Sequence, residues 1–528
     1  MPRKNKMRMP ILIAVFLTFA PAAQAAQAPE NAKLIPILHH GRVKAFDSFC
    51  RQTVETLSGR ETWNKEDAAS LILGVLAYEE KIDDIPWVLV GNAPLRSALG
   101  LDAGKRYFSY AEIMPSLEKI QALMKSAKVK REAERTPSTL EKEAESLYGR
   151  LLAVKELMTG QSLLVIPSSD KNGETWLAPS ESAGGQGAEF RGMLALFSAG
   201  KLAEFDEKVQ QWNEGVHEAT HNTYRRTVRL ESLYSSLKPF QWAWMLYLAA
   251  FLVLSFLKKR RPAGLALVAA AMAFHTLGLV LRVLVLQRPP VSNMYESMVY
   301  MNWAVMVFAV LFALGTRNII YVTAGSAVSA LVMIYGNLLP IDSNLEVLVP
   351  VLRSNYWLTI HVMTIVSSYG AFGLAMALGH RHLFLEMKGK FSKAAQEDSA
   401  QRIYRVIQLG VLLLGMGTVL GGVWANESWG RFWGWDPKET WALITFLAYL
   451  VVVHLKYAKK IDARWLAISS ILGFFFVMMT WYGVNFVLGR GLHSYGFGSG
   501  GMNWILYYLA AEIIFLVLVL GRFYSPKK

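Results

Sequence analysis

From Phe240 onward the sequence is dominated by apolar runs of membrane-spanning length, separated by short polar loops. A helix needs about 20 apolar residues to cross the hydrocarbon core of a membrane, where only helices and closed barrels satisfy their backbone hydrogen bonds. The runs therefore predict an all-α, polytopic membrane helical bundle of about nine spans. The expected spans are 240–257, 263–286, 298–315, 319–339, 357–380, 404–424, 438–456, 465–488 and 503–521.

The chain ahead of these spans is more polar. Residues 1–26 combine basic side chains, an apolar stretch and small residues at candidate cleavage sites, as in a secretory signal peptide or an N-terminal anchor. We expect residues 27–238 to form an exported, mainly helical soluble domain and residues 239–528 to form the membrane domain. Cys50 is the only cysteine, so the chain has no Cys-x-x-Cys motif and can form no internal disulfide. Any thiol chemistry must come from partner proteins.

The net charge of +15 is concentrated in alternate loops of the membrane domain. One set of loops has clusters of Lys and Arg within 258–261, 381–402 and 456–464, and the positive-inside rule makes this set cytoplasmic. The N-terminal domain and the opposite loops are then outside. The positive charge marks loop positions and does not indicate a nucleic-acid partner. The opposite loops have only Arg288, Arg353, Arg431, Lys438 and Arg490.

Between two of the expected spans lies an unusually dense aromatic stretch, W-A-N-E-S-W-G-R-F-W-G-W-D-P-K-E-T-W. Asp436 followed by Pro437 and Glu439 is typical of a capping box, so we expect a helix to begin at Pro437. An aromatic belt at the membrane surface is one interpretation. The density and order of the indoles favour a second one, a platform for a flat ligand. The tryptophans are Trp424, Trp429, Trp433, Trp435 and Trp441.

Four histidines are candidates for metal ligands, because ionisable residues in membrane spans are functional hypotheses by default. His361 and His493 are expected at the same outer face as the tryptophans. Two imidazoles beside indole rings suit haem, whose iron takes axial histidines and whose ring stacks on aromatic side chains. His275 and His454 lie within spans, where a shared second metal site is plausible. Propionate carboxylates of a haem would need cations, for which Arg282, Arg288, Lys438 and Arg490 are candidates.

The soluble domain contains a competing motif. His217, Glu218 and His221 match H-E-x-x-H, which on a helix can hold zinc through both histidines with the glutamate as a base. A membrane-anchored zinc hydrolase using residues 217–221 is therefore an alternative function, against a solvated charged helix face as the simpler interpretation. A b-type electron carrier is a third possibility.

The segments Trp429–Trp441 (W-G-R-F-W-G-W-D-P-K-E-T-W) and Pro290–Ser297 (P-V-S-N-M-Y-E-S) resemble the CcsA (ResC) family of system II cytochrome c biogenesis, with its tryptophan-rich WWD signature. The resemblance covers most of 240–528. In that family His361 and His493 would be the two external haem ligands and His454 the membrane-embedded one. Trp429, Trp433, Trp435, Asp436 and Trp441 would belong to the haem-binding surface.

The resemblance implies haem transport across the bacterial inner membrane and presentation of haem b on the periplasmic side. Apocytochromes c would receive the haem at Cys-x-x-Cys-His motifs, so the expected activity is that of a holocytochrome c synthase, or haem lyase, acting in a complex. The implied partners are a CcsB (ResB) membrane subunit, the apocytochrome and thiol-reducing proteins, with no nucleic acid. Whether His275 replaces a histidine of that subunit stays open.

Overall fold

The computed structural model describes residues 28–77, 79–133, 135–168, 175–182, 185–339, 343–347, 354–389, 391–488, 491–493 and 501–524. The signal peptide or anchor predicted for residues 1–26 lies outside these ranges, as do Arg353 and Arg490. Contacts within the chain separate a first unit that ends at Ser232 from a second that begins at Leu233.

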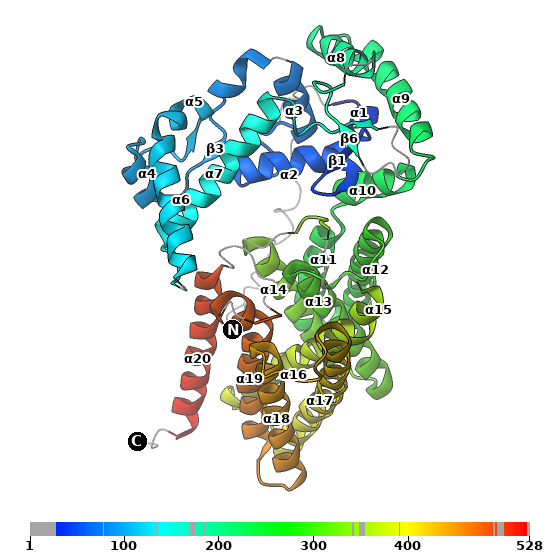
Figure 1. Cartoon of the computed structure of the whole chain (residues 1–528). Coiled ribbons are helices and arrows are strands. Elements are labelled where there is room, and N and C mark those ends of the chain that lie inside the picture. Colours follow the sequence, from blue (N-terminus) through cyan, green and yellow to red (C-terminus); the bar gives the residue numbers. More distant parts are fainter. Residues whose placement is uncertain are drawn as a thin grey trace, which may run out of the picture. The chain divides into compact units, whose positions relative to one another are not determined.

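The first unit is mainly helical, as predicted, with three short antiparallel strand pairs. Its strands pair as β1 (Pro36–His39) with β2 (Arg42–Ala45), β3 (Val88–Leu89) with β4 (Tyr107–Phe108), and β5 (Ile166–Pro167) with β6 (Trp176–Leu177). Its helices are α1 (Glu30–Lys33), α2 (Phe46–Ser58), α3 (Ala68–Ala77), α4 (Ala93–Leu99), α5 (Tyr110–Ile113), α6 (Leu117–Glu132), α7 (Thr139–Met158), α8 (Gly185–Ser198), α9 (Leu202–Ala219) and α10 (Arg225–Leu237), the last of which crosses into the second unit. Figure 1 labels these helices. Two 3-10 segments, Glu79–Asp84 and Met114–Ser116, connect helices.

The hairpin of α6 and α7 is joined by Glu141. Ser138 and Glu141 form a capping box at the start of α7. The Glu141 carboxylate also accepts hydrogen bonds from Ser126 and Lys130 of α6, at 2.6 and 2.8 Å. One carboxylate thus serves both the local helix start and the packing of two helices.

The second unit is a helical bundle. Its long elements are α11 (Pro239–Phe256), α12 (Arg261–Leu286), α13 (Met294–Thr316), α14 (Ile320–Leu338), α16 (Met363–Met387), α17 (Lys393–Trp429), α18 (Pro437–Tyr457), α19 (Ala463–Met478) and α20 (Met502–Tyr524). A 3-10 turn (Lys258–Arg260) joins α11 to α12, and the short α15 (Asn355–Trp357) precedes α16. In the described part of the chain, nine helices are long and apolar enough to cross a membrane, so the predicted number is confirmed.

Two of these spans contain π-helical segments. Leu358–Val362 lies between α15 and α16, and Met479–Leu488 continues α19. A π-helical turn inserts an extra residue per turn and is frequent at functional sites. Both segments line the cavity described below.

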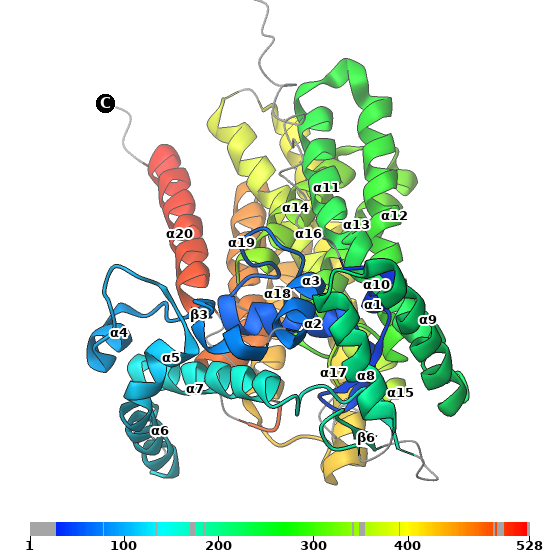
Figure 2. The same cartoon turned by 90° about the horizontal axis from the view of Figure 1, so that it is seen from above.

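Helix α16 is the most buried of the spans and packs against α13, α14, α17 and α19. Small residues permit this close packing, because a Cβ at Gly370 would lie 2.9 Å from the Met301 carbonyl oxygen of α13. On the opposite side, a Cβ at Gly379 would lie 2.9 Å from the Ala467 carbonyl oxygen of α19. Helix α20 lies at the edge of the bundle in both views (Figures 1 and 2).

A buried ion-pair network joins α12 to α13. Arg282 and Arg288 bind opposite oxygens of Glu296, at 3.0 and 2.7 Å, and the Glu296 side chain is fully buried. Burial of charge is costly unless the charges are paired and hydrogen-bonded. The network therefore fixes the start of α13, at the rim of the cavity.

Helix α17 is longer than the expected span 404–424 and continues to Trp429, where Gly430 ends it in the left-handed region. The predicted capping box at Asp436 is confirmed, with Pro437 as the first residue of α18 and Glu439 bonded back to the Asp436 N–H. The loop between α17 and α18 therefore contains only residues 430–436.

Candidate functional site

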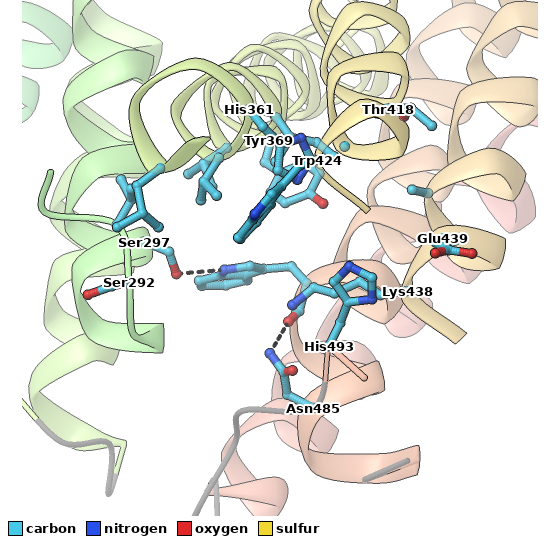
Figure 3. A pocket seen from close by; sticks show the side chains of 18 of the residues that line it. Ser292, Ser297, His361, Tyr369, Thr418, Trp424, Lys438, Glu439, Asn485 and His493 are labelled. Atoms are coloured by element: carbon cyan, nitrogen blue, oxygen red, sulfur yellow. Dashed lines mark hydrogen bonds between the residues drawn. The ribbon is translucent and has the colours of Figure 1, made fainter. Parts of the chain in front are cut away.

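A cavity opens where the start of α13, the start of α16, the end of α17 and the start of α18 converge. The cavity and the open space in front of it together amount to about 1110 Å³. Figure 3 shows His361 and Trp424 across this cavity from His493 and Lys438. The aromatic and ionisable lining residues are His361, Tyr369, Trp424, Phe432, Trp433, Lys438, Glu439, Trp481 and His493.

His361 lies in the π-helical segment Leu358–Val362 and faces α17. Its Nδ1 is 2.8 Å from the carbonyl oxygen of Gly417, so Nδ1–H donates and Nε2 keeps its lone pair. Gly421 makes room for the ring, because a Cβ there would lie 2.5 Å from His361 Cε1. A histidine whose Nδ1–H is bound to a carbonyl and whose Nε2 is available has the arrangement usual for a metal ligand.

His493 has the equivalent arrangement with a carboxylate. Its Nδ1 donates to Asp436 at 3.0 Å, and the same carboxylate accepts the N–H groups of Leu492 and Lys438 at 2.7 and 3.0 Å. Burial by itself raises the pKa of Asp436, but the hydrogen bond from His493 and those two N–H groups outweigh it and lower the pKa to about 2. Asp436 is therefore ionised at neutral pH and orients the His493 ring.

The tryptophans divide between several environments. Trp424 is buried and lines the cavity 5.6 Å from the His361 ring, measured between centroids. Trp433 also lines it, and Trp429 packs perpendicular to the His493 ring at 4.9 Å. Trp441 is half-buried in α18 and is not a lining residue, although its carbonyl oxygen accepts the hydroxyls of Thr445 and Thr480.

Trp435 differs from the others because its indole is 70% exposed and its backbone has φ +56°. A bulky residue rarely adopts the left-handed region, and such strain is concentrated at functional sites. Its ring packs perpendicular to that of Trp433 at 5.8 Å.

Several lining residues were not found by sequence reasoning. Trp481 lies in the π-helical segment Met479–Leu488 and donates from Nε1 to Ser297 Oγ at 3.0 Å. Asn485 lies four residues further on, and its buried Oδ1 has no hydrogen-bond partner among the described residues. Both residues are embedded in an apolar run, where nothing in the sequence separates a cavity-lining side chain from a packed one. Ser297 ends the Pro290–Ser297 motif, most of which lies at the cavity.

His275 and His454 are not brought together. His275 is fully buried among α11, α12 and α13, with Nδ1 3.2 Å from Tyr247 Oη and Nε2 3.0 Å from the Val299 carbonyl oxygen. His454 is exposed on the surface of α18, and its Nδ1 donates to the Leu450 carbonyl oxygen at 2.8 Å. Neither lines the cavity.

The H-E-x-x-H motif does not have the geometry of a zinc site. His217 is buried in α9, whereas His221 follows the end of that helix, is exposed and has φ +49°. Glu231, a carboxylate downstream of the motif, is bound by Arg42. Among the described residues no group of three His, Cys, Asp or Glu side chains is arranged to hold a metal ion.

Comparison with known proteins relates the site to one family. The family described as cytochrome C assembly protein matches residues 291–493, which include the tryptophan stretch and end at His493. Cytochrome c biogenesis protein CcsA of Mesostigma viride is 36% identical over 240 residues, covering 39% of this chain and 77% of that protein. CcsA of Prochlorococcus marinus (strain NATL1A) is 35% identical over 268 residues, covering 44% and 84%.

A longer relative extends the similarity into the first unit. Protein NrfI of Wolinella succinogenes is 30% identical over 494 residues, covering 87% of this chain. This chain spans about half of NrfI, 53% of its length. From these matches and the nine candidate spans, we conclude that the chain belongs to the cytochrome c assembly protein family that includes CcsA and NrfI, and is a multi-pass membrane protein of system II cytochrome c biogenesis.

Proposed function

We propose that this protein binds haem b between His361 and His493 and presents it to apocytochrome c for covalent attachment. The observation that carries the proposal is the pairing of the two histidines in one cavity. Each has its Nδ1–H bound to an acceptor and its Nε2 available for iron. Indole rings on both sides of the cavity suit a flat apolar macrocycle.

The contribution of the chain to the reaction is positioning. Attachment adds a cysteine S–H across a vinyl C=C bond, so that the sulfur bonds to one carbon and the proton goes to the other. No oxidant or reductant is consumed. Cys50 is buried in the first unit, so the thiols belong to the Cys-x-x-Cys-His motif of the apocytochrome and must be kept reduced by thiol-reducing partners. Holding the vinyl group beside the thiol replaces a bimolecular encounter by an oriented one.

Transport of haem to this cavity belongs to the same proposal. Haem enters from the cytoplasmic side of the bacterial inner membrane, and the cavity and the first unit are periplasmic, by the distribution of Lys and Arg in the loops. His454 is exposed on α18, where a polar side chain facing lipid is costly, so we place a CcsB (ResB) membrane subunit against it. Any holocytochrome c synthase activity is that of the complex.

A haem spectrum of the purified full-length protein tests the proposal. We expect an intense Soret band in the wild type, its loss in the double variant His361→Ala, His493→Ala, and no change in His221→Ala, which removes an exposed histidine of the first unit. The spectral experiment is paired with a gene deletion, which should abolish c-type cytochromes and spare b-type ones. A haem-free protein that still matures cytochromes c would refute the proposal, and loss of b-type electron transfer alone would favour a b-type carrier.

A further inference from the structure

The two carboxylates at the start of α18 both have partners. Asp436 binds His493 and two backbone N–H groups. Glu439 accepts the N–H groups of Gly434 and Asp436, at 2.8 and 3.2 Å, and lies 3.5 Å from Arg431. Both side chains therefore already accept hydrogen bonds from neighbouring groups.

Among the described residues, the cations of this region are paired with carboxylates, with one exception. Arg282 and Arg288 bind Glu296, and Arg431 pairs with Glu439. Lys438 lines the cavity, and within the described ranges its ammonium makes neither a hydrogen bond nor an ion pair. Figure 3 shows it beside His493. Among the described residues, Lys438 is thus the one Lys or Arg that lines the cavity, and its ammonium has no ion pair.

We propose that Lys438 binds a carboxylate of the ligand that occupies this cavity. The inference rests on the proposed function, under which that carboxylate is a propionate of haem. An ammonium group in a largely apolar pocket is stabilised by an anion, and a charge-assisted N–H···O contact is about twice as strong as a neutral one. Because Lys438 lies two residues from Asp436, the carboxylate contact and the orientation of His493 come from the same turn of chain. Lys438 therefore determines the orientation of the haem macrocycle in the cavity.

Esterification of the ligand provides a test that does not depend on a variant folding. Binding of haem and of haem dimethyl ester to haem-depleted full-length protein in detergent is measured by absorbance titration. We expect the wild type to prefer haem roughly tenfold, the effect of one charged contact. Lys438→Met should bind both porphyrins with the weaker affinity, whereas Lys438→Arg should keep most of the preference.

Lys456→Met is the matched control, because it removes the same charge from the same helix. Lys456 pairs with Glu397 at 2.8 Å and is about 27 Å along α18 from Lys438. Its variant should keep the wild-type preference. Equal affinities of the wild type for both porphyrins, or an unchanged preference in Lys438→Met, would overturn the assignment while leaving the histidine site intact. If the wild type bound neither haem nor haem dimethyl ester, the proposed function itself would be overturned, and this assignment with it.

Discussion

At the scale of single residues, the site depends on hydrogen bonds that fix the orientation of its side chains. His361 is oriented by a backbone carbonyl and His493 by Asp436, so in each case the second partner decides which ring nitrogen is available. Glycines at the cavity also fix the position of neighbouring rings. Gly422 faces the Phe432 ring so closely that an added Cβ would lie 2.6 Å from Cζ. Mutations that spare both histidines should therefore still disable the site.

Gly421→Ala tests this dependence. The added Cβ would lie 2.5 Å from His361 Cε1, so the imidazole must move away from its bond to Gly417. We expect haem affinity to fall roughly tenfold or more, because loss of the hydrogen bond that orients a ligating histidine typically lowers metal affinity by about that factor. The measurement is the same absorbance titration.

Gly315→Ala is the control for that substitution. Gly315 also lies in a spanning helix, but apart from the backbone of its own helix and its chain neighbours, a Cβ there would meet no atom of the described residues within 4 Å. Haem affinity in this variant should match the wild type. If Gly421→Ala binds haem as tightly as Gly315→Ala does, the position of His361 does not control binding.

At the scale of elements, helix ends and helix irregularities determine what the spans can do. Both π-helical segments face the cavity and supply His361, Trp481 and Asn485 to it. The extra residue of a π turn rotates the side chains that follow, so a face that would pack against a neighbour is turned toward the cavity. In the first unit, polar contacts add to a buried apolar core, as Glu141 does between α6 and α7.

Glu141 makes the α6–α7 hairpin sensitive to acid. The hydrogen bond from Lys130, followed by those from Ser126 and the Ser138 N–H, lowers the pKa of Glu141 from 4.5 to about 2. A carboxyl whose pKa is lower in the folded state stabilises the fold fully above its ordinary pKa, and this stabilisation is lost as the pH falls toward the folded value. We therefore expect amide hydrogen exchange in α6 and α7 to accelerate between pH 4.5 and about 2, beyond the intrinsic pH effect.

Glu141→Gln should remove that component of the pH dependence. The matched control is Glu145→Gln on the same helix, whose partner Arg131 is half exposed and screened by water. The control should retain the wild-type acid sensitivity. An identical pH profile in Glu141→Gln and the wild type would show that the hairpin does not depend on this carboxylate.

At the scale of the whole molecule, the orientation in the membrane determines which side the cavity serves. The lone cysteine makes this testable, because Cys50 is fully buried and should not react in the native protein. Tyr356→Cys and Tyr457→Cys introduce thiols at positions that are 63% and 81% exposed, at opposite ends of the expected topology. With a membrane-impermeant maleimide on spheroplasts, we expect Tyr356→Cys to be labelled at once and Tyr457→Cys only after permeabilisation.

The unmodified chain is the background control for this labelling. Labelling of Tyr457→Cys in intact spheroplasts, with Tyr356→Cys protected, would show the opposite orientation, with the cavity on the cytoplasmic side. Presentation of haem to an exported apocytochrome would then be impossible from this cavity.

The sequence by itself determined the number of spans and the start of α18. Apolar length and the Asp436, Pro437 and Glu439 cap act locally, over one helix or one turn, so they can be read without knowledge of neighbours. The division of the chain into a polar first part and an apolar second part is equally local. The motifs on which the family resemblance rests are short segments and are local in the same sense.

Only the tertiary structure decided which residues share the cavity. His275 and His361 both lie in apolar runs, yet the ring nitrogens of His275 are both used in packing contacts while His361 faces open space. The exposed indole of Trp435 and the cavity position of Trp481 depend equally on contacts between segments far apart in the chain. Long-range packing sets side-chain direction and hydrogen-bond partners, and no local pattern encodes either.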